Sequence, residues 1–326
     1  MKAKKLLAIL LALTLAASLM SLVSCNTKKK YVIGISQLVT HDALDAATQG
    51  FKDAVIAGLG EENVEFDFQN ADNSTDLCST IANSFVNKKV DLIMANATPA
   101  LNAAYNATET IPILGTSITE YGVALNIKDF NGTVGGNVSG TSDLAPLDQP
   151  AQMVLDLVPN AQKVGLLYCS GEANSDYQVK KVKEYLSARG IICTEYTFSG
   201  SDDVAVVAQG AAAQNDALYI PTDNTAASCA TTIYGAMTEK KPIIAGEQGI
   251  CKGCGIATLS IDYYDLGYAT GEMAVKILKG EADISTMPIE YTPESKLAKK
   301  YNKTICDDLG IDTAALEAKG YTAIEE

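Results

Sequence analysis

A repeated alternation of short apolar runs with amphipathic segments fills residues 31–280 of this 326-residue chain. Residues 31–38 form a nearly continuous apolar run, as in a strand that is buried on both faces of a parallel sheet. Residues 42–58 follow with apolar side chains at helical spacing, and Gly58 and Gly60 end that pattern. Because strand and helix patterns alternate, we expect an α/β protein with parallel sheets covered by helices on both faces.

The alternation continues through two similar sets of strand–helix units. The first set has expected strands at 63–69, 90–95 and 111–114, and helices at 74–86 and from Thr98, the predicted N-cap before Pro99. The second set has expected strands at 164–168, 191–198, 217–220, 242–245 and 255–261, and helices at 178–188, 203–213, 226–237 and 266–279. No long low-complexity linker separates the sets, so we expect two closely linked lobes and a hinge.

Residues 135–149, with the sequence GGNVSGTSDLAPLDQ, lie between the two sets. A glycine pair, a short β-like run at 137–139 and a Ser-Asp turn are typical of a chain that crosses from one lobe to the other. If this segment is a crossing, its polar turn, Ser142 and Asp143 included, lines the cleft between the lobes.

The N-terminal residues read as a targeting signal rather than as part of the fold. Three lysines within the first five residues precede an apolar run at 6–19 that is shorter than a typical membrane-spanning helix. Leu22–Cys25 matches a bacterial lipobox, which predicts a signal peptide at 1–24, lipidation of Cys25 and a tether at 25–30. A secretory signal with a chance cysteine is the alternative, but every lipobox position is correctly filled. We therefore expect an exported lipoprotein, anchored to the cell membrane on its extracytoplasmic side.

The charged and catalytic residue types argue against several functions. Asp and Glu number 39 and Lys and Arg 25, a net charge of −14, whereas nucleic-acid binding requires a basic surface. His41 is the only histidine, and we expect it in a turn or first helical turn rather than as a general base. The sequence lacks a nucleophile elbow and a P-loop. We expect a protein that is not an enzyme and that binds no cofactor or metal.

Cys251 and Cys254 form a CxxC motif and carry the main alternative, a redox or metal protein. The motif has neither a second CxxC nor a nearby histidine to complete a zinc site, and no clear helix N-terminus to activate a thiol. With Cys25 lipidated, seven cysteines remain, and an odd number cannot all pair. A loop disulfide or two unreactive thiols is the favoured interpretation.

Polar residues follow the predicted strands at the edge where open parallel sheets bind ligands. They lie at 36–37, 96–98, 116–117, 170–175, 222–224 and 247–248. Helix capping explains any one of them, and it is the preferred reading of Ser175 and Asn224 taken singly. Asp143, Asp223 and Glu247 are acceptors that could hold a ligand ammonium, and their convergence on one cleft favours binding.

Several segments resemble one known family, in family order and over nearly all of residues 31–290. They are SQLVTHDALDAATQGF, NATPALNAA, GGNVSGTSDLAPLDQ, GEANSDYQVKKVKEYL, PTDNTAAS and IDYYDLGYATGEMAVKILKG. These segments are similar to those of the TrpX-like ABC transporter substrate-binding lipoproteins, which have the type I periplasmic-binding-protein fold. The resemblance implies two doubly wound, Rossmann-like lobes joined by a three-crossing hinge. Lobe 1 would comprise 31–140 plus about 262–286, and lobe 2 about 141–261 plus 287–326.

The resemblance also implies the ligand, the partners and the site. Family members bind amino acids, aromatic ones such as tryptophan especially, and pass them to an ABC permease and its ATPase. The positions implied at the cleft are Gln37, Thr98, Thr116, Ser142, Asp143, Asn174, Asp223, Asn224, Glu247 and Tyr263. Thr98 would hold the carboxylate, Asp223 or Glu247 the ammonium, and Tyr263 with Tyr168 the side chain. We expect a monomer, with a nucleoside or sugar as the alternative cargo.

Overall fold

The computed structural model describes residues 30–325 of the chain. The predicted signal peptide, Cys25 and most of the tether lie outside the described residues. In the described part of the chain, no helix combines the length and the apolarity that crossing a membrane requires.

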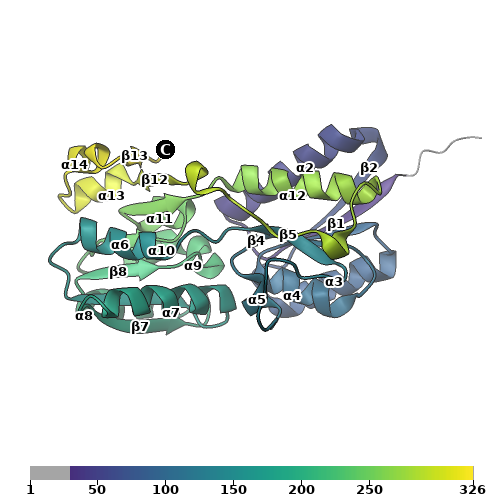
Figure 1. The fold of residues 1–326 in the computed structure, drawn as a ribbon. Helices are drawn as coiled ribbons and strands as arrows, with labels where there is room; N and C mark the ends of the chain where they lie inside the picture. Colours follow the sequence, from purple (N-terminus) through teal and green to yellow (C-terminus); the bar gives the residue numbers. More distant parts are fainter. Residues whose placement is uncertain (1–29, 326) are drawn as a thin grey trace, which may run out of the picture. The chain divides into compact units, whose positions relative to one another are not determined.

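The first sheet has the strand order β11-β5-β4-β3-β1-β2, and all its pairings are parallel (Figure 1). Its strands are β1 (Tyr31–Gln37), β2 (Val64–Asn70), β3 (Leu92–Asn96), β4 (Ile113–Ile118), β5 (Val138–Ser142) and β11 (Glu290–Tyr291). Helices α2 (Asp42–Leu59) and α12 (Tyr263–Leu278) cover one face, and α3 (Thr75–Lys88) and α4 (Thr98–Ala107) cover the other. Successive strand residues alternate between the faces, so Leu92 packs with Phe51 of α2 while Ile93 packs with Phe85 of α3.

The second sheet has the order β13-β12-β10-β9-β8-β6-β7. Its strands are β6 (Lys163–Cys169), β7 (Ile192–Phe198), β8 (Ala217–Ile220), β9 (Ile243–Ala245), β10 (Ala257–Ser260), β12 (Ala298–Tyr301) and β13 (Thr322–Ala323). One face is covered by α6 (Asp148–Leu157), α7 (Ala173–Ser187), α13 (Lys303–Asp308) and α14 (Thr313–Ala318). The other face is covered by α8 (Val204–Gln214), α10 (Ala230–Ala236) and α11 (Gln248–Cys254), and the short α9 (Asn224–Ser228) follows β8.

Within residues 30–325 the chain passes between the two sheets three times, at 143–147, at 261–262 and at 292–297. The predicted α/β class, with two mainly parallel sheets and a three-crossing hinge, is confirmed. The first crossing falls inside the segment predicted for it. The last crossing comes later in the chain than expected. The family resemblance assigns residues 287–326 to the second lobe, whereas β11 pairs with β5 of the first sheet.

Three other local expectations need correction. Strand β12 runs antiparallel to β10, so the second sheet is not wholly parallel. Thr98 is the first residue of α4 rather than its N-cap, which is Ala97 in a left-handed conformation (φ 88°). The helix expected at 226–237 is divided into α9 and α10 at Cys229.

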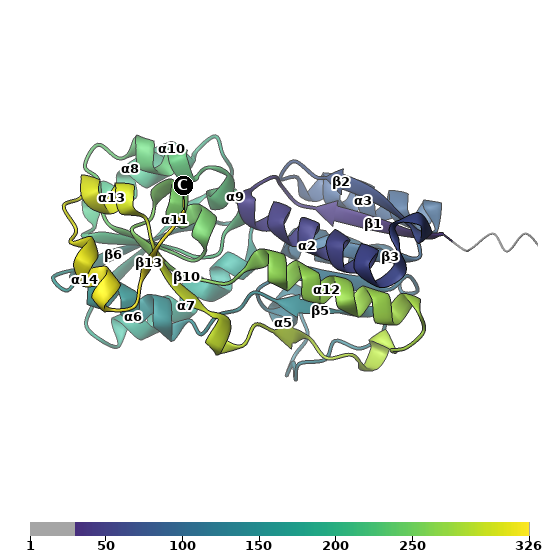
Figure 2. The ribbon, with the colours of Figure 1, turned by 90° about the horizontal axis from the view of Figure 1, so that it is seen from above.

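Helices α2 and α12 lie side by side and parallel (Figure 2), and three glycines allow their backbones to meet. A Cβ added at Gly267 would overlap the carbonyl of Ala47, and a Cβ at Gly50 would overlap the carbonyl of Tyr264. A Cβ at Gly271 would lie 2.6 Å from the carbonyl oxygen of Phe51. The contact therefore fixes the two N-terminal ends of these helices at one edge of the first sheet.

Replacement of Gly267 by alanine is expected to lower the free energy of unfolding by about 2 kcal/mol or more, because backbone cannot move aside for the new methyl group. The matched control is Gly210→Ala in α8, where a Cβ meets nothing within 4 Å. The control is expected to raise stability by about 0.5–1 kcal/mol, since alanine loses less conformational entropy in a helix. Urea unfolding of both variants measures the difference, and equal effects would contradict a glycine-dependent contact.

Candidate functional site

A small polar cavity lies where the carboxyl ends of strands from both sheets meet. Its volume is about 10 Å³. Its lining residues come from both sheets and from the crossings between them: His41, Leu44, Ser117, Thr119, Asp143, Asn174, Thr222, Asp223, Asn224, Ala227, Glu247 and Tyr263. Among these described residues there is no lysine or arginine, so the cavity is lined by acidic and neutral polar groups. We call it the polar cavity.

A β-bulge in β4 turns Ser117 toward the polar cavity. The register between β4 and β5 shifts between Gly115 and Ile118, which places one extra residue in β4. Ser117 occupies this position with a left-handed backbone (φ 56°). Its neighbour Thr116 instead turns away and contacts the hydroxyl of Thr141 at 3.2 Å. The bulge therefore decides which of two adjacent hydroxyl residues reaches the cavity.

Buried polar atoms without a hydrogen-bond partner gather at this place. Over residues 30–325, eight buried side-chain nitrogen or oxygen atoms lack a partner. Four of them belong to residues that line the polar cavity: Nδ1 of His41, Oγ of Ser117, Oδ1 of Asp143 and Oδ1 of Asn174. Most buried polar groups in folded proteins are paired, because an unpaired one costs about 1–3 kcal/mol. Their concentration at one cavity points to a polar ligand.

Asp143 opens the first crossing and is 7% exposed. Its Oδ2 accepts a hydrogen bond of 2.9 Å from the hydroxyl of Tyr263 at the start of α12. Burial raises the pKa of Asp143 to about 6, although the hydroxyls of Tyr263 and Thr119 partly oppose that rise. Asp143 is therefore a buried carboxylate that has one free oxygen and no cationic partner.

Asp223 and Glu172 form the acidic wall on the side of the second sheet. The Asp223 carboxylate caps α9 through the Ala226 N–H and also accepts hydrogen bonds from the Cys169 N–H and the Ser175 hydroxyl. Burial and the charge of Glu172 raise the pKa of Asp223. Glu172 in turn accepts bonds from the backbone and side chain of Asn224. Both carboxylates thus orient the residues of α9, and Asp223 has little capacity left for a ligand.

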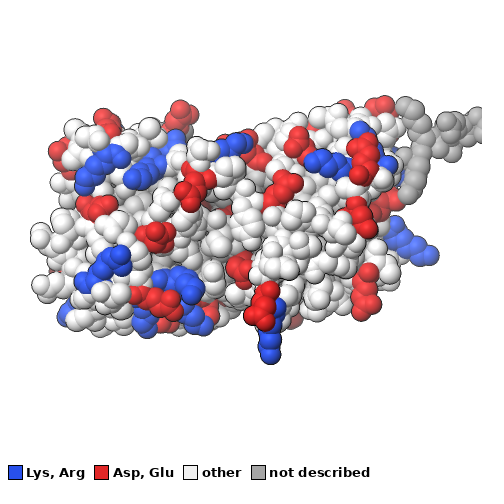
Figure 3. Space-filling model, in the orientation of Figure 1, with Lys and Arg blue, Asp and Glu red and all other residues white. Residues whose placement is uncertain are grey.

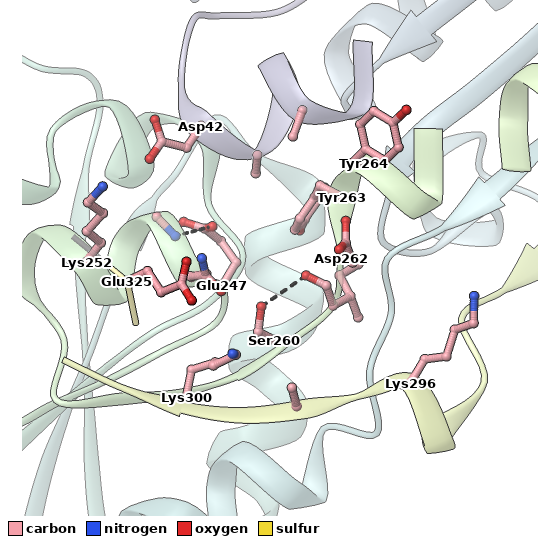
Figure 4. Close-up of a pocket in the computed structure, with 16 residues that line it drawn as sticks. Asp42, Glu247, Lys252, Ser260, Asp262, Tyr263, Tyr264, Lys296, Lys300 and Glu325 are labelled. Atoms are coloured by element: carbon pink, nitrogen blue, oxygen red, sulfur yellow. Dashed lines mark hydrogen bonds between the residues drawn. The ribbon is translucent and has the colours of Figure 1, made fainter. Parts of the chain in front are cut away.

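Glu247 caps α11 by accepting hydrogen bonds from the N–H groups of Gly249 and Ile250. Burial raises the pKa of Glu247, and the nearby His41 opposes that rise. Glu247 and Tyr263 also face a larger, open pocket whose rim carries charges of both signs, including Asp42 and Lys252 (Figure 4). This pocket therefore shares two lining residues with the polar cavity.

We call the first sheet with its helices the first half of the protein and the second sheet with its helices the second half. His41 connects the parts of the site that the two halves contribute. It occupies the N-cap position of α2, and its Nε2 lies 3.3 Å from Oδ1 of Asn224 in the second half. Because Nδ2 of Asn224 donates to Glu172, Oδ1 of Asn224 is the acceptor and His41 Nε2 the donor. The Nδ1 atom of His41 then faces the cavity beside the N-terminus of an 18-residue helix, where partial positive charge collects.

A second cavity of about 20 Å³ adjoins the polar cavity, and Asp143, Thr222 and Tyr263 line both. Its remaining lining is mainly apolar: Ala145, Leu147, Pro150, Gln178, Tyr219, Ala245, Gly246, Leu259 and Ile261. We call it the apolar cavity. Together the two cavities present polar groups at one end and apolar side chains at the other. They would suit a ligand with a charged end and an apolar end.

The structure brings six of the predicted site residues to the polar cavity: Asp143, Asn174, Asp223, Asn224, Glu247 and Tyr263. Four others, Gln37, Thr98, Thr116 and Ser142, are buried but line neither cavity. Their contact with a ligand stays a prediction, and the structure does not place them at either cavity. Gln37 bonds to Asp45 and Thr48 under α2, and Ser142 bonds to the Thr119 carbonyl, so these side chains stabilise the first half instead. Tyr168 also lies outside both cavities and donates its hydroxyl to Glu195.

Sequence reasoning missed several residues of the site. His41 is read as a turn residue, and Ser117 is passed over in favour of Thr116. Glu172 lies in the quoted segment GEANSDYQVKKVKEYL, but it is not singled out although it holds α9 in place. Tyr219 lies in an apolar strand, so the sequence pattern predicts a core residue, and only its hydroxyl group differs from the neighbouring apolar side chains.

The CxxC motif lies in α11 rather than in a loop. Cys251 and Cys254 are free, fully buried thiols that point toward the carbonyls of Gly255 and Ile250. The loop-disulfide interpretation is therefore wrong. Burial raises the pKa of both thiols, which disfavours the reactive thiolate. No group of three or more His, Cys, Asp or Glu residues with the placement of a metal site occurs in the described part of the chain.

Comparison with known sequences gives a consistent result. The model of the family described as ABC transporter substrate binding protein matches residues 32–316. A tyrosine-binding protein of Clostridioides difficile strain R20291 is 36% identical over 312 residues, which cover 91% of this chain and 90% of the relative.

Two solved structures extend the comparison. An ABC domain from Streptococcus pneumoniae in complex with L-Trp has a TM-score of 0.84 at 31% identity and covers 91% of this chain and 100% of its own. A ligand-free, open substrate-binding protein with adhesive properties from Clostridium difficile has a TM-score of 0.67 at 38% identity. It covers 90% of this chain and 100% of its own. The Trp-bound structure is therefore more similar in arrangement although it is less similar in sequence.

Asp143→Asn is expected to raise the stability of the ligand-free protein by about 2 kcal/mol at pH 7.5. The pKa of folded Asp143, about 6, lies above the unfolded value, so the folded state binds more protons and stability falls as pH rises through this range. Urea unfolding, after bound ligand is removed by denaturation and refolding, measures the effect at pH 7.5 and pH 4.5. The gain should fall to about 1 kcal/mol or less at pH 4.5, closer to the unfolded pKa, and be absent in the exposed control Asp202→Asn. A less stable Asp143→Asn protein at pH 7.5 would contradict the interpretation.

Proposed function

Because this chain belongs to the family of ABC transporter substrate-binding proteins, we propose that it captures an aromatic L-amino acid between its two halves. Its function is to bind a solute outside the cytoplasm and to deliver it to an ABC permease and its ATPase. The observation that carries the proposal is the group of unpartnered buried polar atoms at the polar cavity, next to a second cavity with apolar walls.

The polar cavity supports recognition of an ammonium group. Oδ1 of Asp143 and Oδ1 of Asn174 are buried acceptors without a donor, and Glu247 adds a third carboxylate to the lining. An ammonium has three donors and no acceptor, so these oxygens are suitable partners for it. Burial without such a cation raises the pKa of Asp143 and of Glu247, and the charge of Glu247 adds to the rise at Asp143. We assign the main ammonium contact to Asp143.

The opposite side of the polar cavity supports recognition of a carboxylate. The hydroxyl of Ser117 lacks a partner among the described residues and can donate to a carboxylate. The N-terminus of α2 adds backbone N–H groups and partial positive charge. This assignment replaces Thr98 with Ser117 and the start of α2. Donors on one side and acceptors on the other match the two charges of a free amino acid.

The nature of the side chain is proposed from the apolar cavity and the relatives. One relative is named for tyrosine binding, and one solved structure contains L-Trp. The higher TM-score to the Trp-bound structure than to the ligand-free, open one also supports a closed arrangement of the two halves. Closure would shield the buried charges from water, which strengthens their contacts with the ligand.

The proposal also includes export and anchoring through Cys25, a monomeric state, and binding without catalysis or cofactor. On the face in Figure 3, acidic and basic side chains are interspersed, and no large basic patch of the kind that nucleic acid requires is visible there. The buried, high-pKa thiols of Cys251 and Cys254 disfavour the redox alternative. A nucleoside or sugar ligand is an outcome that the binding test distinguishes.

Calorimetric titration of the fragment from Tyr31 onward, freed of bound ligand, with amino acids, nucleosides and sugars is expected to detect binding of L-Tyr or L-Trp. At 100 times its dissociation constant the ligand should add about 2.7 kcal/mol to the free energy of unfolding. Binding of nucleosides or sugars alone would overturn the proposed ligand class but leave the family assignment intact.

Asp143→Asn is expected to weaken amino-acid binding at least about tenfold, because the ammonium loses a charged partner in a buried site. Asp202→Asn removes an exposed carboxylate outside both cavities and should leave the affinity unchanged. Unchanged binding by Asp143→Asn would remove Asp143 from the ammonium site.

Affinity is also expected to fall about tenfold from pH 7.5 to pH 5. The ammonium needs the ionised form of Asp143, whose pKa is about 6 without ligand, so protons compete with the ligand at low pH. Titration at four pH values in this range tests the expectation, and the slope should be reduced in Asp143→Asn. A pH-independent affinity in the wild-type protein would contradict the role of this carboxylate.

A further inference from the structure

We propose that the Tyr219 hydroxyl forms a hydrogen bond with a polar group on the ligand ring, a phenol or an indole N–H, and thereby selects against phenylalanine. The inference rests on the proposed function, and it specifies which aromatic amino acids the same site accepts. It depends on the position of Tyr219, on the lack of a partner for its hydroxyl, and on the chemistry of the surrounding wall.

Tyr219 lies in the middle of the second sheet and lines the apolar cavity. It belongs to β8, where it is paired with Leu166 of β6 and Ile244 of β9, and its exposure is 0%. Its neighbours Leu218 and Ile220 pack on the opposite face of the sheet. The Tyr219 side chain therefore lies on the face of α6, whose Pro150 lines the same cavity.

The Tyr219 hydroxyl has no hydrogen-bond partner among the described residues. Apart from Oδ1 of Asp143, which is assigned to the ligand ammonium, the other side-chain polar groups of the apolar cavity are already engaged there. The amide of Gln178 bonds to the backbone of Thr222 in both directions, and the Tyr263 hydroxyl donates to Asp143. The Thr222 hydroxyl donates to the Gly246 carbonyl. Tyr219 thus supplies an uncommitted donor and acceptor within a largely apolar wall.

The arrangement of the two cavities determines how a bound amino acid would be oriented. Asp143 lines both of them, so an amino acid whose ammonium contacts Asp143 can extend its side chain into the apolar cavity. The cavity of about 20 Å³ is smaller than an aromatic ring, so Leu147, Leu259 and Ile261 would move apart to enclose the ring, with Tyr219 as the remaining polar contact. A phenol or an indole N–H satisfies the Tyr219 hydroxyl, whereas a phenyl ring leaves it buried and unpaired. Sites built around such a bond reject the analogue that lacks it.

The test is calorimetric titration of wild type and Tyr219→Phe with L-Tyr, L-Trp and L-Phe. The wild type is expected to bind L-Tyr or L-Trp at least about tenfold more tightly than L-Phe. Tyr219→Phe should lose most of this preference, through weaker binding of the polar ring and equal or tighter binding of L-Phe. Thermal unfolding and circular dichroism establish that the variant is folded.

The control Tyr301→Phe removes a buried hydroxyl from the same sheet, one that bonds to Glu317 and lies outside both cavities. It should leave the preference unchanged even if it lowers stability. A folded Tyr219→Phe protein with the wild-type preference would overturn the inference while leaving the proposed function intact. Failure of the wild type to bind any of the three amino acids would overturn both.

Discussion

The backbone contact between α2 and α12 is the constraint on which the site depends. In the sequence, α2 follows β1, whereas α12 follows β10, after most strands of the second sheet. Because Gly50 and Gly267 allow the two backbones to touch, the distance between the helices does not depend on side-chain rotamers. The two helices are parallel, so their N-terminal ends bring His41 and Tyr263 to the same cavity. A local interaction within the first half thereby positions groups that meet the second half.

The hydrogen bonds around the cavity distinguish carboxylates that hold the fold together from a carboxylate that still has an oxygen free for a ligand. Asp223 and Glu172 are acidic, but several N–H and O–H donors hold each of them at the start of α9. Asp143 receives a bond on Oδ2 only and retains a free oxygen. Burial of such a carboxylate lowers the free energy of unfolding of the ligand-free protein. A bound cationic ligand compensates for the lost hydration of the carboxylate and so stabilises the folded protein. Stability of the free protein and affinity for the ligand are therefore opposed at this residue.

The sequence predicts the architecture well because buried parallel strands are apolar throughout and helices have an apolar period of their own. It also identifies the edge of the sheets where the polar cavity lies and names Asp143 there, while the family resemblance adds Asn174 and Tyr263. It does not predict which way a residue at that edge points. Thr116 and Ser117 are equivalent by composition, and only the bulge in β4 separates them.

The roles of other residues depend on contacts between distant segments. Asp223 and Glu247 look like free acceptors in the sequence, yet each caps a short helix whose start is not evident from a periodic pattern. Tyr219 has the pattern of a core residue, and the lack of a partner for its hydroxyl becomes visible only when all its neighbours are known. Asp143 has one further property: its backbone N–H bonds to Ile118 of the first sheet, and the chain leaves for the second sheet directly after it. Under the proposed function, a ligand held by this carboxylate would be attached to the first residue of a segment that joins the two sheets, so release of the ligand and any relative motion of the two halves would act on the same stretch of backbone.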